Sequence, residues 1–210
     1  MPDASSASSA PPALPAQPAE VHAFCYGPDG GAGSAAGYRP EWIRKDAAFD
    51  ASIRARFAPL VVRALTLPTG APPAWGAAPA EVLAEILVLD QFPRNLYRGQ
   101  ARAFAGDARA LALALALIGR GDDRRLRPLE RLFAYLPLEH AEDLALQDRS
   151  VALFGALAAE DAGFGEVLDY AERHRDVILR YGRFPHRNAA LGRASTPAEV
   201  EYLAQPGSGF

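Results

Sequence analysis

The chain has 210 residues, half of them apolar, and a formal net charge of -3 at neutral pH. This length and composition favour a single soluble domain with a sizeable buried core. The acidic balance excludes a broad nucleic-acid-binding surface, which would need many cations on one face.

Residues 1–19 consist almost entirely of alanine, serine and proline, with neither a cationic start nor a continuous apolar segment. This composition predicts a disordered tail rather than a secretory signal, followed by one helical domain over residues 20–210. The most apolar run, Leu111 to Ile118, is too short to span a bilayer. We therefore expect a cytoplasmic protein that does not bind membranes.

Helical spacing of apolar residues dominates the remaining sequence, and no stretch alternates in the manner of a strand. The predicted helices cover residues 19–26, 46–65, 79–92, 101–118, a short segment from Pro128, 138–159, 166–181 and a last segment from Thr196. A glycine-rich loop over residues 27–37 and a Pro/Gly-rich linker over 68–79 separate the early helices. The last helix begins with Thr196-Pro197-Ala198-Glu199, a capping box. About eight helices with short connections predict an all-α array.

For two of the helices and for the cysteine, the sequence predicts which side chains are buried. In the helix over 46–65, the inward stripe is Phe49, Ile53, Phe57, Leu60 and Ala64. In the helix over 101–118, it is Phe104, Ala108, Leu111, Leu115 and Ile118. The single cysteine, Cys25, excludes an intrachain disulfide and is expected to be a small buried apolar residue.

Asp90 lies where the helix over 79–92 should place an apolar residue, after Val82, Leu83, Ile86 and Leu87. A carboxylate is costly to bury unless it is paired, and Arg94 and Arg98 follow directly. Asp90 either clamps the turn after its helix or serves as a site carboxylate.

Histidines and an amide also lie on predicted apolar stripes. His140 and Gln147 share the inward face of the helix over 138–159, and His174 lies on that of the helix over 166–181. Each could be a hydrogen-bonded core residue. Because buried polar groups need partners, these side chains are also natural partners for one another.

The segment from Val177 to Ala198 contains no acidic residue, although the whole chain is acidic. Its specialised polar residues are Arg183, His186, Arg187, Asn188 and Arg193. They either brace helix ends or form an anion pocket in which guanidinium groups hold a carboxylate or phosphate. Residues 139–143 are rich in acid and complement this segment. We expect Arg183 or Arg187 within salt-bridge reach of Asp90, Glu139, Glu142 or Asp143, beside His140 or His174.

Other kinds of site have less support in the sequence. His140, His174 and His186 with Glu142 or Asp143 could form a metal-binding set, but no pair has the His-Glu-x-x-His spacing of zinc enzymes. There is no Gly-x-Ser-x-Gly elbow, phosphate-binding loop or dinucleotide fingerprint. The prediction is therefore no metal and no cofactor.

Three segments resemble a known family: Leu89-Asp90-Gln91-Phe92-Pro93-Arg94-Asn95-Leu96-Tyr97-Arg98-Gly99, Leu136-Pro137-Leu138-Glu139-His140-Ala141-Glu142-Asp143 and Gly182-Arg183-Phe184-Pro185-His186-Arg187-Asn188. With Leu191-Gly192-Arg193 and Thr196-Pro197, they resemble the bacterial family called "domain of unknown function 924", in order, from about Val21 to Phe210. That family usually has Trp in a Phe-Trp-Phe-Gly start, where this chain has Phe24-Cys25-Tyr26-Gly27. The resemblance implies a right-handed superhelical array like that of tetratricopeptide repeats. It implies no established activity.

Two functions remain open. The first is a pocket that binds a small anionic molecule, with hydrolytic or acid–base chemistry as the reaction class to test. Its catalytic candidates are His140, His174 and Asp90, and its ligand-binding candidates are Arg94, Gln147, Arg183, His186, Arg187, Asn188 and Arg193. The alternative is an interaction module that binds a peptide or protein on a concave helical surface. Whether the chain is an enzyme, and its oligomeric state, stay open.

Overall fold

We describe a computed structural model of the chain, covering Leu14, residues 16–27, Arg39, Trp42 and residues 45–209. The α-helices are α1 (Pro18–Tyr26), α2 (Ala47–Ala64), α3 (Pro79–Ile86), α4 (Phe92–Leu96), α5 (Asp107–Gly119), α6 (Pro128–Glu139), α7 (Leu144–Glu160), α8 (Gly165–Tyr181) and α9 (Pro197–Leu203). Short 3-10 turns occur at Ala101–Phe104, Asp122–Arg125, Ala162–Phe164 and Pro185–Arg187. No strand occurs in these described residues, and the all-α prediction is confirmed.

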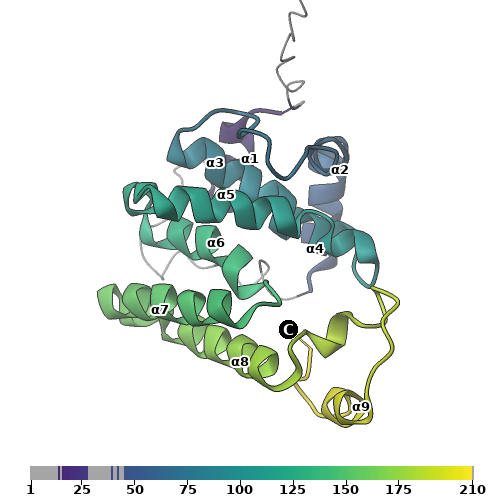
Figure 1. The fold of residues 1–210 in the computed structure, drawn as a ribbon. Coiled ribbons are helices and arrows are strands. Elements are labelled where there is room, and N and C mark those ends of the chain that lie inside the picture. The colour runs from purple at the N-terminus through teal and green to yellow at the C-terminus, as the bar shows by residue number, and fades with distance from the viewer. Residues whose placement is uncertain (1–13, 15, 28–38, 40–41, 43–44, 210) are drawn as a thin grey trace, which may run out of the picture.

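The helices pack largely in chain order (Figure 1). Helix α5 contacts α3 and α6, α6 contacts α7, and α7 contacts α8. One buried apolar cluster contains residues from α1 to α8, and a smaller cluster of Val177, Ile178 and Phe184 joins the end of α8 to the C-terminal segment. The handedness of a superhelix is a prediction that this neighbour-to-neighbour packing does not test. No helix in the described ranges is long and apolar enough to cross a membrane.

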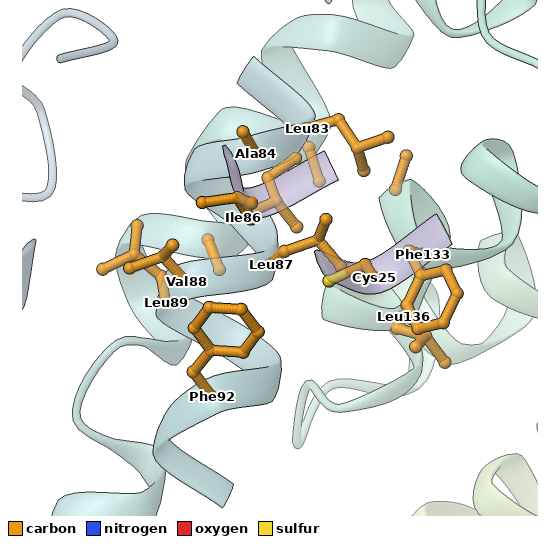
Figure 2. Packing of buried hydrophobic residues seen from close by; sticks show 14 of the residues in the cluster. Cys25, Leu83, Ala84, Ile86, Leu87, Val88, Leu89, Phe92, Phe133 and Leu136 are labelled. Atoms are coloured by element: carbon orange, nitrogen blue, oxygen red, sulfur yellow. The ribbon is translucent and has the colours of Figure 1, made fainter. Parts of the chain in front are cut away.

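Figure 2 shows the part of the core where α1, α3 and α6 meet. Cys25 of α1 belongs to the same buried cluster as Leu87 and Phe133, with 4% of its surface exposed. Burial raises the pKa of its thiol to about 12, so Cys25 acts as a small apolar residue, as predicted. The predicted stripe of α2 is confirmed, because Ile53, Phe57, Leu60 and Ala64 are buried and Phe49 packs against them.

The predicted tail boundary at residue 19 falls inside the described structure. Leu14 is buried with 5% of its surface exposed, Ala16 packs against the core, and α1 begins at Pro18. Burial of the Leu14 side chain stabilises the folded state by removing apolar surface from water, an effect that the average Ala/Pro-rich composition of the segment does not reveal. Residues 1–13 and Pro15 lie outside the described residues, as do residues 28–38 of the predicted glycine-rich loop.

The predicted helix over 138–159 is wrong, because the chain forms two helices here. Helix α6 continues through Pro137 to Glu139, and His140 is its C-cap. Asp143 then caps α7 by accepting a hydrogen bond from the backbone N–H of Leu146 at 3.0 Å. The apolar spacing runs across the break, whereas the capping side chain decides where α7 starts.

The helix predicted over 79–92 does not stop at Pro93. Between α3 and α4 the chain forms a π-helical segment, Leu87–Gln91, in which the N–H of Phe92 donates to the carbonyl of Leu87. Pro93 lies in the first turn of α4, where its missing N–H breaks no helical bond. The carbonyl of Leu89 instead faces Gly106, where an added Cβ would lie only 2.2 Å from the oxygen.

The predicted inward stripe of the helix over 101–118 is confirmed only in part, because Leu111, Leu115 and Ile118 are half-buried against the core cluster. Residues 101–104 form a 3-10 turn, α5 starts at Asp107, and Ala108 is exposed. The buried residues of α5 are Arg109, Ala110, Leu113, Ala114 and Leu117. The Leu/Ala run is apolar on every side, so its sequence does not determine which face is buried. The phase is fixed by Arg109, which pairs with Glu85 inside the protein.

Candidate functional site

A cavity of about 480 Å³ opens between the π/α4 region, the C-terminal end of α6, α8 and the segment that follows α8. Its polar lining residues are Gln91, Arg94, Asn95, Arg98, Glu139, His140, Glu166, Tyr170, His174, His186 and Arg187. Its larger apolar lining residues are Trp42, Phe104, Leu132, Leu136, Phe164 and Val167. The volume lies in the range of sites for small molecules.

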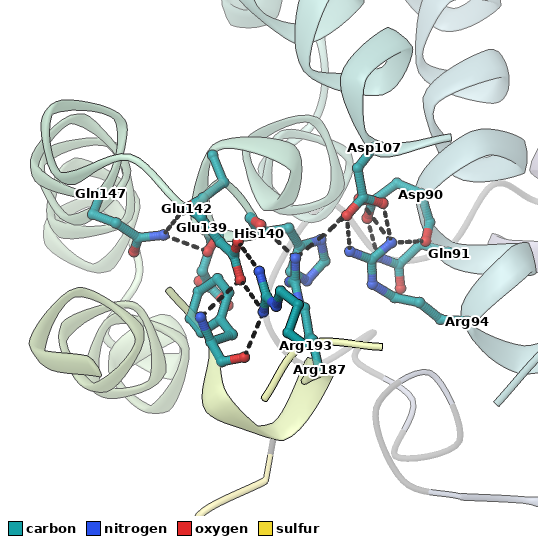
Figure 3. Close-up of polar contacts among 12 residues, drawn as sticks. Asp90, Gln91, Arg94, Asp107, Glu139, His140, Glu142, Gln147, Arg187 and Arg193 are labelled. Atoms are coloured by element: carbon teal, nitrogen blue, oxygen red, sulfur yellow. Dashed lines mark hydrogen bonds and ion pairs between the residues drawn. The ribbon is translucent and has the colours of Figure 1, made fainter. Parts of the chain in front are cut away.

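Asp90 lies directly behind this cavity, fully buried on the π-helical segment (Figure 3). Its carboxylate accepts hydrogen bonds from the Gln91 amide at 2.5 Å and contacts the Nδ1 atom of His140 at 2.8 Å. Arg94 lies 3.3 Å from the same carboxylate and also donates to the Asp90 carbonyl. Burial alone would raise the pKa of Asp90, but Arg94 and His140 outweigh it and hold that pKa well below its usual value.

His140 is therefore oriented by an ionised carboxylate. An ionised Asp90 can only accept, so Nδ1 of His140 carries the proton and Nε2 keeps its lone pair. Burial and the charge of Arg94 lower the pKa of His140 more than Asp90 raises it. The imidazole that lines the cavity is neutral and has a free basic nitrogen at physiological pH.

Two arginines, Arg94 and Arg187, line the cavity beside His140. Arg94 makes a bidentate contact with Asp107 at 2.8 and 3.0 Å, in addition to its contact with Asp90. Arg187 donates to the His140 carbonyl at 3.0 Å and lies 3.5 Å from Asp107. The Arg187 guanidinium also lies over the rings of Phe104 and Phe184, at 4.8 and 4.4 Å. Burial, together with the charge of Arg94, lowers the pKa of Arg187 to about 10, so it stays cationic at neutral pH.

Glu139 and His174 form a second polar contact on the same wall. Nδ1 of His174 donates to the Tyr170 carbonyl at 2.8 Å and lies 3.4 Å from Oε1 of Glu139. Burial, with the negative charge of Asp90, raises the pKa of Glu139 to about 8. Burial lowers the pKa of His174 to about 3. Both groups are neutral at pH 7, so this contact is not an ion pair.

His186 also lines the cavity, next to Arg187. Burial and the charge of Arg187 lower its pKa to about 4, so it is a neutral imidazole. Its ring lies 5.6 Å from that of Phe184.

The other predicted ligand-binding residues do not line the cavity. Gln147 donates from Nε2 to the carbonyls of Glu139 and Ala141, and so caps the end of α6. Arg183 makes a bidentate pair with Glu199. Asn188 donates to Ser195 and Glu199, and Arg193 makes a bidentate pair with Glu142. Arg183, Asn188 and Arg193 thus shape the segment that carries His186 and Arg187, whereas Gln147 stabilises the end of α6.

The expected meeting of the acidic and basic motifs occurs, but the predicted ion pairs are wrong. Arg183 pairs with Glu199, and Arg187 with Asp107. It is Arg193 that reaches Glu142, whose carboxylate also accepts from the backbone N–H of Phe184. Arg187 contacts the motif over residues 139–143 through the His140 carbonyl rather than through a carboxylate, and its guanidinium lies between two aromatic rings.

Within the described residues, no three His, Cys, Asp or Glu side chains are arranged to hold a metal ion. Nδ1 of His140 faces Asp90, Nδ1 of His174 donates to a carbonyl, and Glu142 binds Arg193. Of the residues of the metal-binding alternative, Glu142 and the Nδ1 atoms of His140 and His174 thus already have partners within the protein.

The chain matches, over residues 22–207, the family of bacterial proteins of unknown function called DUF924. It belongs to this family. Over 89% of this chain and 96% of the other, it is similar to the solved structure of a protein of unknown function from Agrobacterium tumefaciens, with 39% sequence identity and a TM-score of 0.73. No curated protein matches the chain.

The three DUF924-like segments each contribute to the cavity wall. The first supplies Arg94, the second Glu139 and His140, and the third His186 and Arg187. The sequence did not identify Gln91, Phe104 or Asp107 as part of this DUF924 site. Asp107 could have been identified, because an aspartate directly after Gly106 favours the start of a helix. It also follows closely after Arg94, Arg98 and Arg102, with which an acid can pair.

The Glu139→Gln variant is expected to remove a pH dependence of stability from this DUF924 protein. The folded state holds a proton on Glu139 up to about pH 8, whereas an unfolded glutamate releases it near 4.5. Between these values the folded state binds more protons, so the free energy of unfolding of the wild type falls as pH rises. Glutamine stays neutral, and the variant should gain stability relative to the wild type across that window in urea unfolding experiments.

Glu160→Gln is the matched control, since Glu160 lies on α7, is exposed and pairs with Arg131 of α6. Its pKa is lowered by the hydrogen bond from Arg131, so it stays ionised across the whole window. An equal pH trend in both variants would contradict a protonated Glu139.

Proposed function

We propose that this protein binds a small anionic molecule in the cavity and uses His140 as a general base. The observation that carries the proposal is the Asp90–His140 contact on the wall of a cavity that Arg94 and Arg187 also line. A carboxylate that fixes one imidazole nitrogen leaves the other directed away from it, as acid–base catalysis requires. The basic nitrogen and the cations are then available to the same ligand.

The preference for an anion follows from where the charges lie. Arg94, Arg98 and Arg187 line the cavity, whereas their partners Asp50, Asp90 and Asp107 do not. Of the two acids that do line it, Glu139 is protonated at neutral pH. Guanidinium groups backed by carboxylates keep fixed orientations, and they stabilise negative charge that is bound or that develops during a reaction.

Acid–base chemistry is supported by the opposite environments of two neighbouring carboxyl groups. Asp90, on the π segment, is ionised, whereas Glu139, at the end of α6, holds a proton, although both side chains are buried. Such a separation is typical of acid–base pairs. In a hydrolysis, His140 would take the proton of a water molecule, and Glu139 would supply one to the leaving group.

Binding is tested by calorimetric titration of inorganic phosphate into the wild type and the Arg187→Gln variant. We expect Arg187→Gln to weaken binding at least about tenfold, the usual effect of losing a charged hydrogen bond. Arg183→Gln is the matched control, because Arg183 lies four residues earlier and pairs with Glu199 outside the cavity. Equal loss in both variants, or no phosphate binding at all, would contradict an anion site.

The chemistry is tested with p-nitrophenyl acetate and p-nitrophenyl phosphate as probes. Loss of a general base reduces turnover by about 10²–10⁴-fold, so His140→Gln should abolish most of the hydrolysis that the wild type shows. Unchanged hydrolysis in His140→Gln would remove the catalytic part of the proposal and leave the binding part.

The interaction-module alternative requires a continuous exposed groove of apolar and charged side chains. The largest exposed apolar residues in the described ranges are instead spread over α2, α7, α8 and the C-terminal segment. The convergence of the polar motifs on one cavity therefore favours the pocket.

A further inference from the structure

The cavity wall formed by α6 changes character along the helix axis. Leu132, Leu136 and His140 follow one another at intervals of four residues, so they lie on one face, and all three line the cavity. Glu139 lines it beside His140. At 1.5 Å per residue, this face passes from apolar to polar over about 12 Å.

Helix α8 repeats this gradient in the same direction. Phe164, just before α8, and Val167 in its first turn are apolar, and His174 lies two turns further on; Glu166, beside Val167, also lines the cavity but is exposed to solvent. His174 contacts Glu139, and its ring lies 6.4 Å from that of His140, so the polar ends of both helices coincide. Helix α7 packs against both α6 and α8, and short connections join it to each of them. It therefore runs antiparallel to both, so α6 and α8 run parallel to each other. Their apolar ends consequently lie at the same end of the cavity.

Two aromatic residues of the cavity lining have different neighbours. Trp42, which lines the cavity, packs edge-on against Phe133, the neighbour of Leu132, at 4.9 Å. Phe104 instead carries the guanidinium groups of Arg94 and Arg187, at 5.6 and 4.8 Å. Trp42 therefore belongs to the apolar end, and the two cations belong to the polar end.

We propose that the ligand is an amphipathic acid, with its anionic group between Arg187 and His140 and its apolar body along Leu136 toward Leu132 and Val167. This proposal rests on the proposed function and names the substrate class of the same site. An inorganic anion would fill only the polar end and leave the apolar walls in contact with water. An aliphatic or aromatic body covers those walls, and the gain grows with the apolar area removed from water.

The test is a series of titrations followed by protein NMR chemical shifts, which detect weak binding. The ligands are acetate, butanoate, hexanoate and octanoate. Each added methylene should tighten binding by up to about fourfold until the apolar end is full. Adipate has the chain length of hexanoate but a second carboxylate, which would face Val167, so it should bind more weakly than hexanoate. 1-Hexanol lacks the anionic group and should also bind more weakly.

Val167→Phe fills the apolar end and should abolish the gain from hexanoate and octanoate while acetate still binds. Leu179→Phe is the matched control on α8, because Leu179 is 56% exposed and lies outside the cavity lining. Equal affinity for acetate and octanoate would overturn the amphipathic ligand and leave the anion site. Failure of every carboxylate to bind would overturn the amphipathic acid, and it would overturn the anion site as well only if phosphate also failed to bind. Binding of 1-hexanol as tight as that of hexanoate would overturn the role of the anionic group.

Discussion

Arg109→Met is expected to lower the free energy of unfolding by about 3–5 kcal/mol, the usual effect of removing one partner of a buried ion pair. Glu85 is completely buried, and Arg109 is 3% exposed. The guanidinium makes two hydrogen bonds to Glu85 and further ones to the carbonyls of Pro68, Ala71 and Pro72. Methionine keeps much of the apolar volume but leaves an uncompensated carboxylate and three carbonyls without this donor.

Urea unfolding of Arg109→Met and of the double variant Glu85→Leu/Arg109→Met measures the effect. The double variant should be more stable than the single one, because no buried charge remains; the Ala74 N–H, which donates to Glu85, loses its acceptor in return. Arg125→Met is the control for an exposed pair, since Arg125 contacts Asp122 on the surface and should matter little. A double variant less stable than Arg109→Met would show that the lost hydrogen bonds matter more than the buried charge.

Asp90→Asn is expected to destabilise the protein by about 3 kcal/mol, near the lower end of the same range, because Arg94 keeps its second partner Asp107. The amide would face donors from Gln91 and His140 with only one acceptor oxygen. Asp148→Asn, at an exposed pair with Arg175 on α7, is the matched control.

The pH dependence of the Asp90→Asn effect follows from the lowered pKa of Asp90. The stabilisation is present above the unfolded value of 3.8 and is lost as pH falls below it. The difference in free energy of unfolding between wild type and variant should therefore be constant near neutrality and shrink in acid. An unchanged melting temperature at pH 7 would contradict a paired, buried Asp90.

Local signals in the sequence were sufficient for the all-α class, for the approximate position of most helices and for the cap of α9. Thr196 and Glu199 form the predicted capping box, with Thr196 Oγ1 accepting from Glu199 N–H and Glu199 accepting from Thr196 N–H. The spacing of bulky residues also determined the buried face of α2. The phase of α5 could not be predicted, because its determinant is a tertiary ion pair with a residue 24 positions earlier.

The candidate site was predictable to the extent that buried polar groups need partners. That rule correctly brought Asp90, His140 and the segment around Arg187 together. It could not assign individual partners, because many pairings of arginines with acids satisfy it equally well. Arg183 and Arg193 illustrate this, since each makes the bidentate contact expected of a binding residue but makes it with an acid of the protein itself.

The π-helical segment Leu87–Gln91 lies between α3, which packs in the core, and α4, which carries Arg94 of the cavity wall. It contains one residue more than an α-helical turn needs, and each residue of an α-helix adds about 100° of rotation. The wider π turn takes up this extra residue, so Arg94 keeps nearly the angular position relative to α3 that an α-helix one residue shorter would give it. A further residue inserted as ordinary α-helix would instead turn Arg94 by that angle, so the core contacts of α3 would survive while the cationic wall faced elsewhere. The number of residues between α3 and α4 is thus a determinant of the cavity in its own right, independent of the identity of any side chain that lines it.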